Sequence, residues 1–180
     1  VSTTGGDAYA IDAGLEDYHG DFRYYDSTVE LEAGASVAGK IRLQGSADTL
    51  TLSGATGSST LTDALAGCEA INVTGGKWTI SGSVAGCNAL TVQGGSLALN
   101  NTCDGAVTVG ANGTLSGTGT LASLVNSGTV SPGNSVGTLT VDGNYRQTSG
   151  STLVIETVTS GKYDCDLLHV GGTAAIEGGR

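Results

Sequence analysis

The 180-residue chain carries 17 Asp and Glu against 7 Lys and Arg, a formal net charge of −10 at pH 7. With so few basic residues, none of them clustered, it is not expected to bind nucleic acid or an anionic membrane surface. Its 31 glycines, single proline and abundant Val, Leu, Thr and Ile indicate one domain of strands joined by tight turns. No apolar run approaches the roughly 20 residues of a membrane helix, and no signal-peptide layout opens the chain, so we expect targeting segments outside it.

An aromatic cluster lies near the N-terminus, in the stretch DYHGDFRYYD (17–26). Tyrosine and arginine are enriched at the energetically dominant positions of binding interfaces. An aromatic cluster at the end of a repeat protein also commonly caps the terminal repeat, so both interpretations stay open. The candidate binding residues are Tyr18, Phe22, Arg23, Tyr24 and Tyr25.

Two successive segments in the middle of the chain repeat each other. AGCEAINVTGGKWTISGS (66–83) aligns without a gap on AGCNALTVQGGSLALNNT (85–102), at an offset of 19 residues. Both begin with Ala-Gly-Cys, alternate apolar with polar residues and carry a Gly-Gly pair between two runs. A looser third copy contains Val107, Val109 and Leu115, and an earlier copy contains Leu50 and Leu52.

Alternation with period two, interrupted by glycine, predicts short strands with one apolar face. A unit of about 19 residues cannot bury that face alone, so neighbouring units must stack. The predicted fold is therefore all-β, a parallel β-helix with coils about 4.8 Å apart. At roughly 19 to 20 residues per coil, the chain is expected to form about nine coils in one continuous domain.

Four cysteines, Cys68, Cys87, Cys103 and Cys165, are candidate disulfide partners. Cys68 and Cys87 occupy equivalent repeat positions, and stacked coils would hold their Cα atoms about 5 Å apart, within the range of a disulfide. Cys103 falls near the same column, so a Cys87–Cys103 bridge competes with it. The alternative is a column of reduced, buried thiols. No Cys-x-x-Cys pair is present and the two histidines are isolated, so neither a metal site nor a cofactor is expected.

The only proline, Pro132, lies in SGTVSPGNSVGTLTV (127–141). Its fixed φ angle and missing N–H favour a corner between strands, where Gly133 and Asn134 reverse the chain. The Gly-x-Ser-x-Gly spacing around Ser135 matches the nucleophile elbow of hydrolases, but that motif needs a helix after the serine. Because the segment after Ser135 reads as a strand, we expect a structural turn and no catalytic residue.

Residues 113–157 resemble the C-terminal β-helix repeat of Gram-negative autotransporter passenger domains, a type V secretion family. The resemblance rests on the order and spacing of GTGTL, NSGTV, PGNS, GTLTV, GNY and GSTL. It extends over about 48–179, whereas residues 1–47 match less well. The four cysteines are the main departure, because passengers of this family tend to have few.

The resemblance implies a right-handed β-helix, export through the periplasm and the outer membrane, and a stable C-terminal end that templates folding. It divides the single domain into N-terminal coils or a cap (1–47), regular coils (48–144) and C-terminal, autochaperone-like coils (145–180). No catalytic residue is implied.

The expected function is that of a surface-exposed or secreted passenger segment, which acts as a stalk and folding template and as an adhesion or host-interaction module. Its expected partners are a host cell-surface or matrix protein, or bacterial cells, and the outer-membrane translocator domain of its own precursor. End-to-end self-association is a further assembly that open end coils would allow. One alternative is a released effector that binds a host receptor. Another is a polysaccharide-acting β-helix enzyme, for which the sequence offers no cluster of carboxylates and basic residues.

Overall fold

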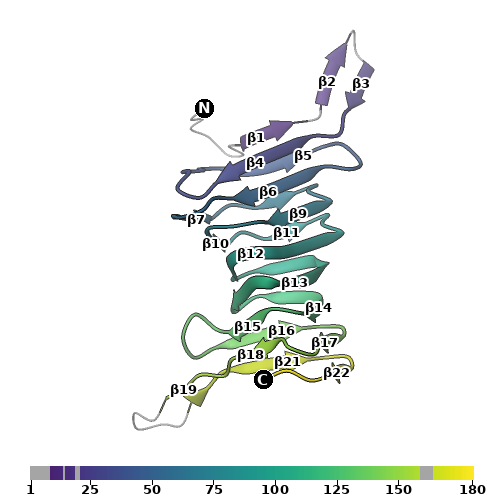
Figure 1. Ribbon diagram of the computed structural model, residues 1–180. Helices are drawn as coiled ribbons and strands as arrows, with labels where there is room; N and C mark the ends of the chain where they lie inside the picture. The colour runs from purple at the N-terminus through teal and green to yellow at the C-terminus, as the bar shows by residue number, and fades with distance from the viewer. Residues whose placement is uncertain (1–8, 14, 19–20, 159–163) are drawn as a thin grey trace.

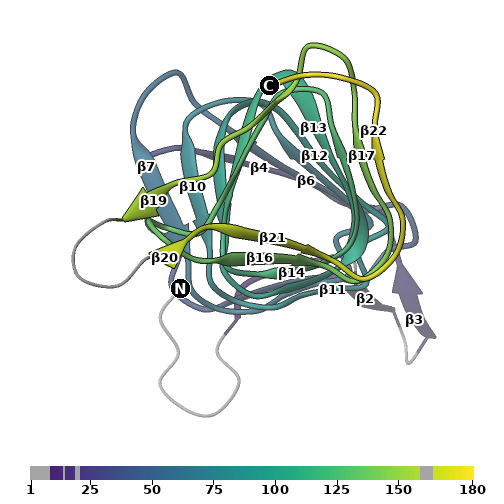
Figure 2. The same cartoon turned by 90° about the horizontal axis from the view of Figure 1, so that it is seen from below.

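The computed structural model of the protein describes residues 9–13, 15–18, 21–158 and 164–180. Within these residues every regular element is a β-strand, and most strands belong to one parallel sheet that coils around a common core. The result is a β-solenoid of about seven turns with a three-sided cross-section (Figures 1 and 2). The parallel β-helix predicted from the repeats is confirmed.

Each side of the solenoid is a ladder of parallel strands. The first side contains β4 (Thr28–Glu32), β6 (Thr49–Ser53), β9 (Ala70–Val73), the start of β12 (Ala89–Leu99), the middle of β13 (Thr102–Gly117), the end of β14 (Thr120–Asn126), β17 (Tyr145–Gln147) and β22 (Ala174–Ile176). The second side contains β7 (Ser58–Leu61), β10 (Lys77–Ile80), the ends of β12 and β13, β15 (Thr129–Pro132) and β18 (Thr152–Leu153). The third side contains β1 (Tyr9–Ala13), β5 (Lys40–Leu43), β8 (Leu65–Ala66), β11 (Val84–Ala85), the starts of β13 and β14, β16 (Thr138–Val141) and β21 (Leu167–Val170).

Two antiparallel hairpins project from the coils. The first consists of β2 (Leu15–Tyr18) and β3 (Asp21–Tyr24), between the third side and the first. The second consists of β19 (Thr157–Val158) and β20 (Asp164–Cys165), between the second side and the third. Figure 1 shows one hairpin near each end of the rod.

The register between coils follows the alignment of the repeats. Ile71 lies beside Leu90 and Trp78 beside Leu97, at the predicted offset. The looser third copy is also in place, with Leu97 beside Leu115. Aligned apolar residues of the repeats therefore stack as continuous inward columns.

The predicted number of about nine turns is too high, because the turns differ in length. Leu90 and Val107 are register partners 17 residues apart, whereas Tyr145 and Ala174 are 29 apart. The longest turn carries the β19–β20 hairpin, and the first turn carries the β2–β3 hairpin. Residues spent on these hairpins do not add coils.

The core is a single apolar column filled from all three sides. Twenty-seven described residues form it, and most of them are Val, Leu or Ile with almost no exposed surface. Trp78 fits in because its indole N–H donates to the carbonyl oxygens of Gly75 at 3.0 Å and Ser53 at 3.3 Å. Within the described residues, every buried side-chain nitrogen and oxygen has a hydrogen-bond partner.

Candidate functional site

Four of the residues predicted to bind a partner, Tyr18, Phe22, Arg23 and Tyr24, lie on the β2–β3 hairpin, and Tyr25 directly follows it. Its register places Phe22 opposite Asp17 and Tyr18 opposite Asp21, while Arg23 lies opposite Glu16. Seen along the solenoid axis, its strands lie at the corner between the third and first sides, outside the outline of the coils (Figure 2). The strands thus project from this corner beyond the N-terminal end of the coils (Figure 1).

Two tyrosines at the end of this hairpin are open to solvent. Tyr24 is 63% exposed and Tyr25 is 50% exposed. The next residue, Asp26, accepts hydrogen bonds from the backbone N–H groups of Ser46 at 2.8 Å and Ala47 at 2.9 Å, which hold the pKa of its carboxyl below the usual value. Both tyrosines are therefore presented directly beside an anchored segment.

A buried carboxylate provides a second anchor below the tyrosines. Asp48 is fully buried and accepts hydrogen bonds from the backbone N–H groups of Ser27 and Gly45, the latter at 2.6 Å. A Cβ atom on Gly45 would lie 2.7 Å from the carbonyl oxygen of Tyr25, so this close approach requires glycine. Nothing in the sequence pattern distinguished Asp48 from the other acidic residues.

The corner at the single proline is a tight turn between the second and third sides. Pro132 ends β15, and Gly133 follows with a φ angle of +89°. Gly117 and Gly133 each donate their N–H group to the carbonyl oxygen of the other, at 2.9 and 2.8 Å. Asn134 donates from its side-chain nitrogen to the side-chain oxygen of Asn100 at 2.8 Å. Ser135 is followed by strand β16, where a nucleophile elbow needs a helix.

A buried carboxylate also holds this corner. Asp166 is 4% exposed and accepts hydrogen bonds from the N–H groups of Gly137 and Glu156, both at 2.9 Å. It ties the turn after Pro132 to the segment that leads into the β19–β20 hairpin. An open depression beside it is lined by Ser116, Ser131, Pro132, Gly133, Asn134, Ser135 and Glu156.

The disulfide prediction is wrong, because all four cysteines are free thiols and none lies at bonding distance from another. Cys68, Cys87 and Cys103 are buried and Cys165 is exposed. The Cys68 thiol is directed to the carbonyl oxygen of Ala66 in its own coil, at 4.0 Å, and not to the next coil. The structure thus has the alternative arrangement, buried thiols that pack as small hydrophobic side chains.

Register explains why stacking did not produce a bridge at the other pair. Cys103 lies beside Val84, not beside Cys87. The hydrogen bond with Cys103, together with burial, raises the pKa of the Cys87 thiol. Burial raises the pKa of Cys68 to about 12, with further contributions from Asp48 and Glu69. The thiols of Cys68 and Cys87 are therefore neutral at neutral pH.

A second depression follows the corner between the first and second sides over three coils. It is lined by Ala55, Thr56, Gly57, Ser58, Gly76, Lys77, Gly95 and Ser96. Its glycines are required by stacking: a Cβ atom on Gly95 would lie 2.4 Å from the carbonyl oxygen of Gly76. The lining is mostly backbone and small side chains, with one cation at Lys77.

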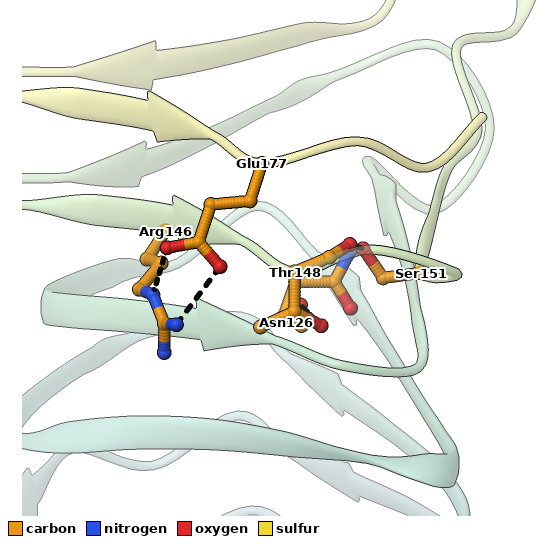
Figure 3. A network of polar contacts seen from close by, with 5 residues as sticks. All are labelled: Asn126, Arg146, Thr148, Ser151 and Glu177. Carbon is orange, nitrogen blue, oxygen red and sulfur yellow. Dashed lines mark hydrogen bonds and ion pairs between the residues drawn. The ribbon is translucent and has the colours of Figure 1, made fainter.

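The last turn is tied to the coil before it by a polar network (Figure 3). Arg146 forms a bidentate ion pair with Glu177, at 2.7 and 2.8 Å, which raises the pKa of the guanidinium group. The buried Asn126 accepts a hydrogen bond from the Thr148 hydroxyl at its carbonyl oxygen, at 3.1 Å, and Ser151 donates its hydroxyl to the Thr148 carbonyl oxygen at 2.8 Å. These contacts close the corner after β17.

Among the residues that the structure describes, no group of three or more His, Cys, Asp or Glu is placed to hold a metal ion. The same residues contain no helix of the length and apolarity needed to span a bilayer. His19 lies outside the described residues. Among the aromatic side chains whose exposure the structure describes, Tyr24 and Tyr25 are the most exposed.

Comparisons with protein-family models, with curated proteins and with solved structures give no match to this chain.

Proposed function

We propose that this chain is a structural passenger segment: a β-solenoid stalk that holds an interaction surface away from a bacterial cell. The observation that carries the proposal is the single apolar core, whose buried residues run from β5 to β17 and which is flanked by partly buried apolar residues from β1 to β21. Contacts between neighbouring coils hold the rod together and fix the distance between its two ends, whereas the residues on its outer face can vary. This function needs no catalytic residue.

The resemblance to autotransporter passengers supports placing the rod at the surface of a Gram-negative bacterium, or in the medium after export across the periplasm and the outer membrane. In the precursor, the nearest partner would be its own translocator domain. The residues that carry the resemblance build β13 to β18, in the C-terminal half of the rod.

The C-terminal turns would also act as the folding template. They contain two features that tie distant segments together, the Arg146–Glu177 ion pair and the buried Asp166. In a solenoid each coil is a surface on which the next coil can form, so a stable end can nucleate the rest.

Fusion to an autotransporter translocator and display on a Gram-negative cell tests the export and template functions together. Leu139→Asp in β16 should abolish protease-resistant surface display, because it places a charge in the core of the template. The matched Leu50→Asp in β6 should leave a protease-resistant C-terminal fragment at the surface. Equal loss of all resistant material in both variants would contradict a C-terminal template, and wild-type protein trapped in the periplasm would contradict export.

Adhesion or host interaction is proposed for the β2–β3 end, because Tyr24 and Tyr25 are exposed beside an anchored segment. A host cell-surface or matrix protein is the proposed partner, and a released effector that binds a host receptor would use the same surface. Binding of the displayed protein to matrix proteins should be saturable and should fall at least tenfold in Tyr24→Ala/Tyr25→Ala. Binding that is unchanged in this variant would move the interaction to another part of the rod.

A further inference from the structure

The corner between the first and second sides becomes shorter over three successive coils. Residues 54–57 form it between β6 and β7, residues 74–76 form it between β9 and β10, and β12 crosses it without interruption. The corner before β7 accordingly stands farther out than the corner before β10 (Figure 2). Beside it lies the depression lined by residues 55–58, 76–77 and 95–96, whose volume of about 630 Å³ is within the range of small-ligand sites.

Two glycines contribute backbone to the lining of this depression, and coil stacking requires both of them. A Cβ atom on Gly76 would lie 2.5 Å from the Cβ atom of Ala33, and a Cβ atom on Gly95 would meet the carbonyl oxygen of Gly76. At these two positions no side chain stands between a ligand and the peptide groups. A polar ligand can therefore approach the backbone closely.

The depression adjoins the outer face of the second side, which carries two columns of outward residues. The register places in the first column Ser58, Lys77, Ser96, Thr114, Thr129 and Thr152. The second column contains Thr60, Thr79, Ala98, Ser116 and Ser131. Every residue of both columns is exposed or partly exposed. Hydroxyl groups, each able to donate and to accept a hydrogen bond, therefore recur along the whole face.

Lys77 is the single charged residue of these two columns, and it also lines the depression. It is exposed, and Ser58 and Ser96 lie beside it in the column, each one coil away at about 4.8 Å. Neither column contains Asp or Glu, whereas the outer face of the first side carries the exposed Glu30 and Glu32. The second side thus combines one cation with many hydroxyl groups.

We propose that the depression and the adjoining face of the second side bind a mostly neutral oligosaccharide that carries one acidic sugar. The carboxylate of that sugar pairs with Lys77, and the sugar hydroxyls bond to Ser58, Ser96 and the glycine backbone. A densely charged polyanion is opposed by the net charge of −10, and a fully neutral ligand leaves the cation without a counter-charge. The inference goes beyond the proposed stalk and its protein partner, because it assigns a second site to a different class of ligand.

An extended peptide fits this face less well than an oligosaccharide. Peptides bind to sheets by adding a strand to a free edge, with side-chain pockets for specificity. The strands β10, β12, β13 and β15 are paired along both edges on the second side, so they offer no free edge. The lining of the depression is glycine, alanine and small hydroxyl residues around Lys77, without a pocket for a large side chain. Recognition through hydroxyl groups needs neither feature.

Binding of the full chain to a glycan array tests the proposal, with each neutral backbone displayed with and without one acidic sugar. Biotin can be attached at Cys165, because this thiol is exposed and the other three are buried, and several copies on streptavidin amplify a weak affinity. We expect glycans with one acidic sugar to bind at least about tenfold more tightly than their neutral counterparts. Binding to no glycan, equal binding to both members of each pair, or a preference for dense polyanions would overturn the proposal.

Surface substitutions locate the site on the rod. Lys77→Gln should weaken binding at least about tenfold and Lys77→Arg should retain most of it, whereas Lys40→Gln, which removes the same charge from the third side, should change it little. Ser96→Glu places a negative charge one coil from Lys77 and should abolish binding. The matched Thr91→Glu adds the same charge to the first side of that coil and should leave binding intact. Thermal unfolding checks that each variant is folded, and equal effects within either matched pair would contradict a site at Lys77.

Discussion

Coils in the middle of the rod and coils at its ends are built from the same alternating pattern, yet they bury very different fractions of their side chains. Leu90 and Leu97 in β12 have no exposed surface, whereas Leu168 in β21 is partly exposed and Ile176 in β22 is 61% exposed. The difference lies in the neighbours and not in the residues. An inner coil is covered from both sides, and an end coil from one.

The largest effect is expected for truncation in the middle of the core. Leu97→Ala should lower the free energy of unfolding by about 3–5 kcal/mol, because the cavity is closed on both sides by neighbouring coils. The matched Leu168→Ala should cost about 1–2 kcal/mol, because solvent already reaches that position. Urea denaturation of both variants measures the comparison, and equal losses would show that the last coil is as well packed as the middle.

Glycine substitution should separate the same two regions. Gly95→Ala combines a φ angle of +70° with a Cβ atom 2.4 Å from the Gly76 carbonyl oxygen, so it should cost about 3 kcal/mol. Gly150→Ala has a φ angle of +88° with nothing within 4 Å of the new atom, so it should cost about 1 kcal/mol. Thermal unfolding of both proteins provides the measurement, and a ranking in the opposite order would argue against tight coil stacking at Gly95.

Substitution of the two buried carboxylates should not follow the difference in stability loss between middle and end coils. Asp48 and Asp166 lie near opposite ends, and each accepts two backbone hydrogen bonds from neighbouring segments. Asp48→Ala and Asp166→Ala should each cost about 2–3 kcal/mol, because two buried N–H groups lose their acceptor. The conservative asparagine variants keep one acceptor oxygen and should recover part of this loss in urea denaturation. If only the Asp166 substitution left the free energy of unfolding unchanged, the last turn would be able to rearrange without loss of stability.

The smallest effect is expected at the exposed ion pair of the first turn. The hydrogen bond from Arg42 holds the pKa of Asp12 below its usual value, so the pair adds stability above a pH of about 4, the unfolded pKa, and loses it as the pH falls through the folded value. Both side chains are about a third exposed, at 38% and 35%, so Asp12→Asn should cost only about 0.3 kcal/mol at pH 7. Stability measured from pH 7 downward should show a slightly flatter acid limb in the variant. A loss several times larger would indicate that the first turn depends on this pair.

The repeats carried enough information to predict the architecture and much of the register. Period-two alternation and the 19-residue offset placed Ile71 beside Leu90 and Trp78 beside Leu97, as the structure has them. These predictions succeeded because stacking aligns equivalent residues wherever the turn length is constant. The number of turns was overestimated because the two hairpins interrupt that constancy, and a hairpin leaves no signal in the repeat pattern.

The details of the candidate site were harder to predict, because they depend on distances across coils. Equivalent positions suggested a bridge between Cys68 and Cys87, but the Cys68 thiol is directed to a carbonyl oxygen of its own coil. Asp48 looked like any acidic residue, although two backbone N–H groups converge on it. Side-chain direction and backbone convergence are set by the folded corners, which a linear alignment does not contain.

The corner that carries the β19–β20 hairpin has a further consequence. Despite the long excursion between β18 and β21, the register of β21 on β16 continues without a shift, with Leu168 beside Leu139 and Val170 beside Val141. Corner length is thus decoupled from coil stacking, since an extended loop adds only a slowly growing closure entropy. Such corners are natural graft points: foreign peptides inserted there would be displayed along the rod, and sequence can diversify there without disturbing the scaffold.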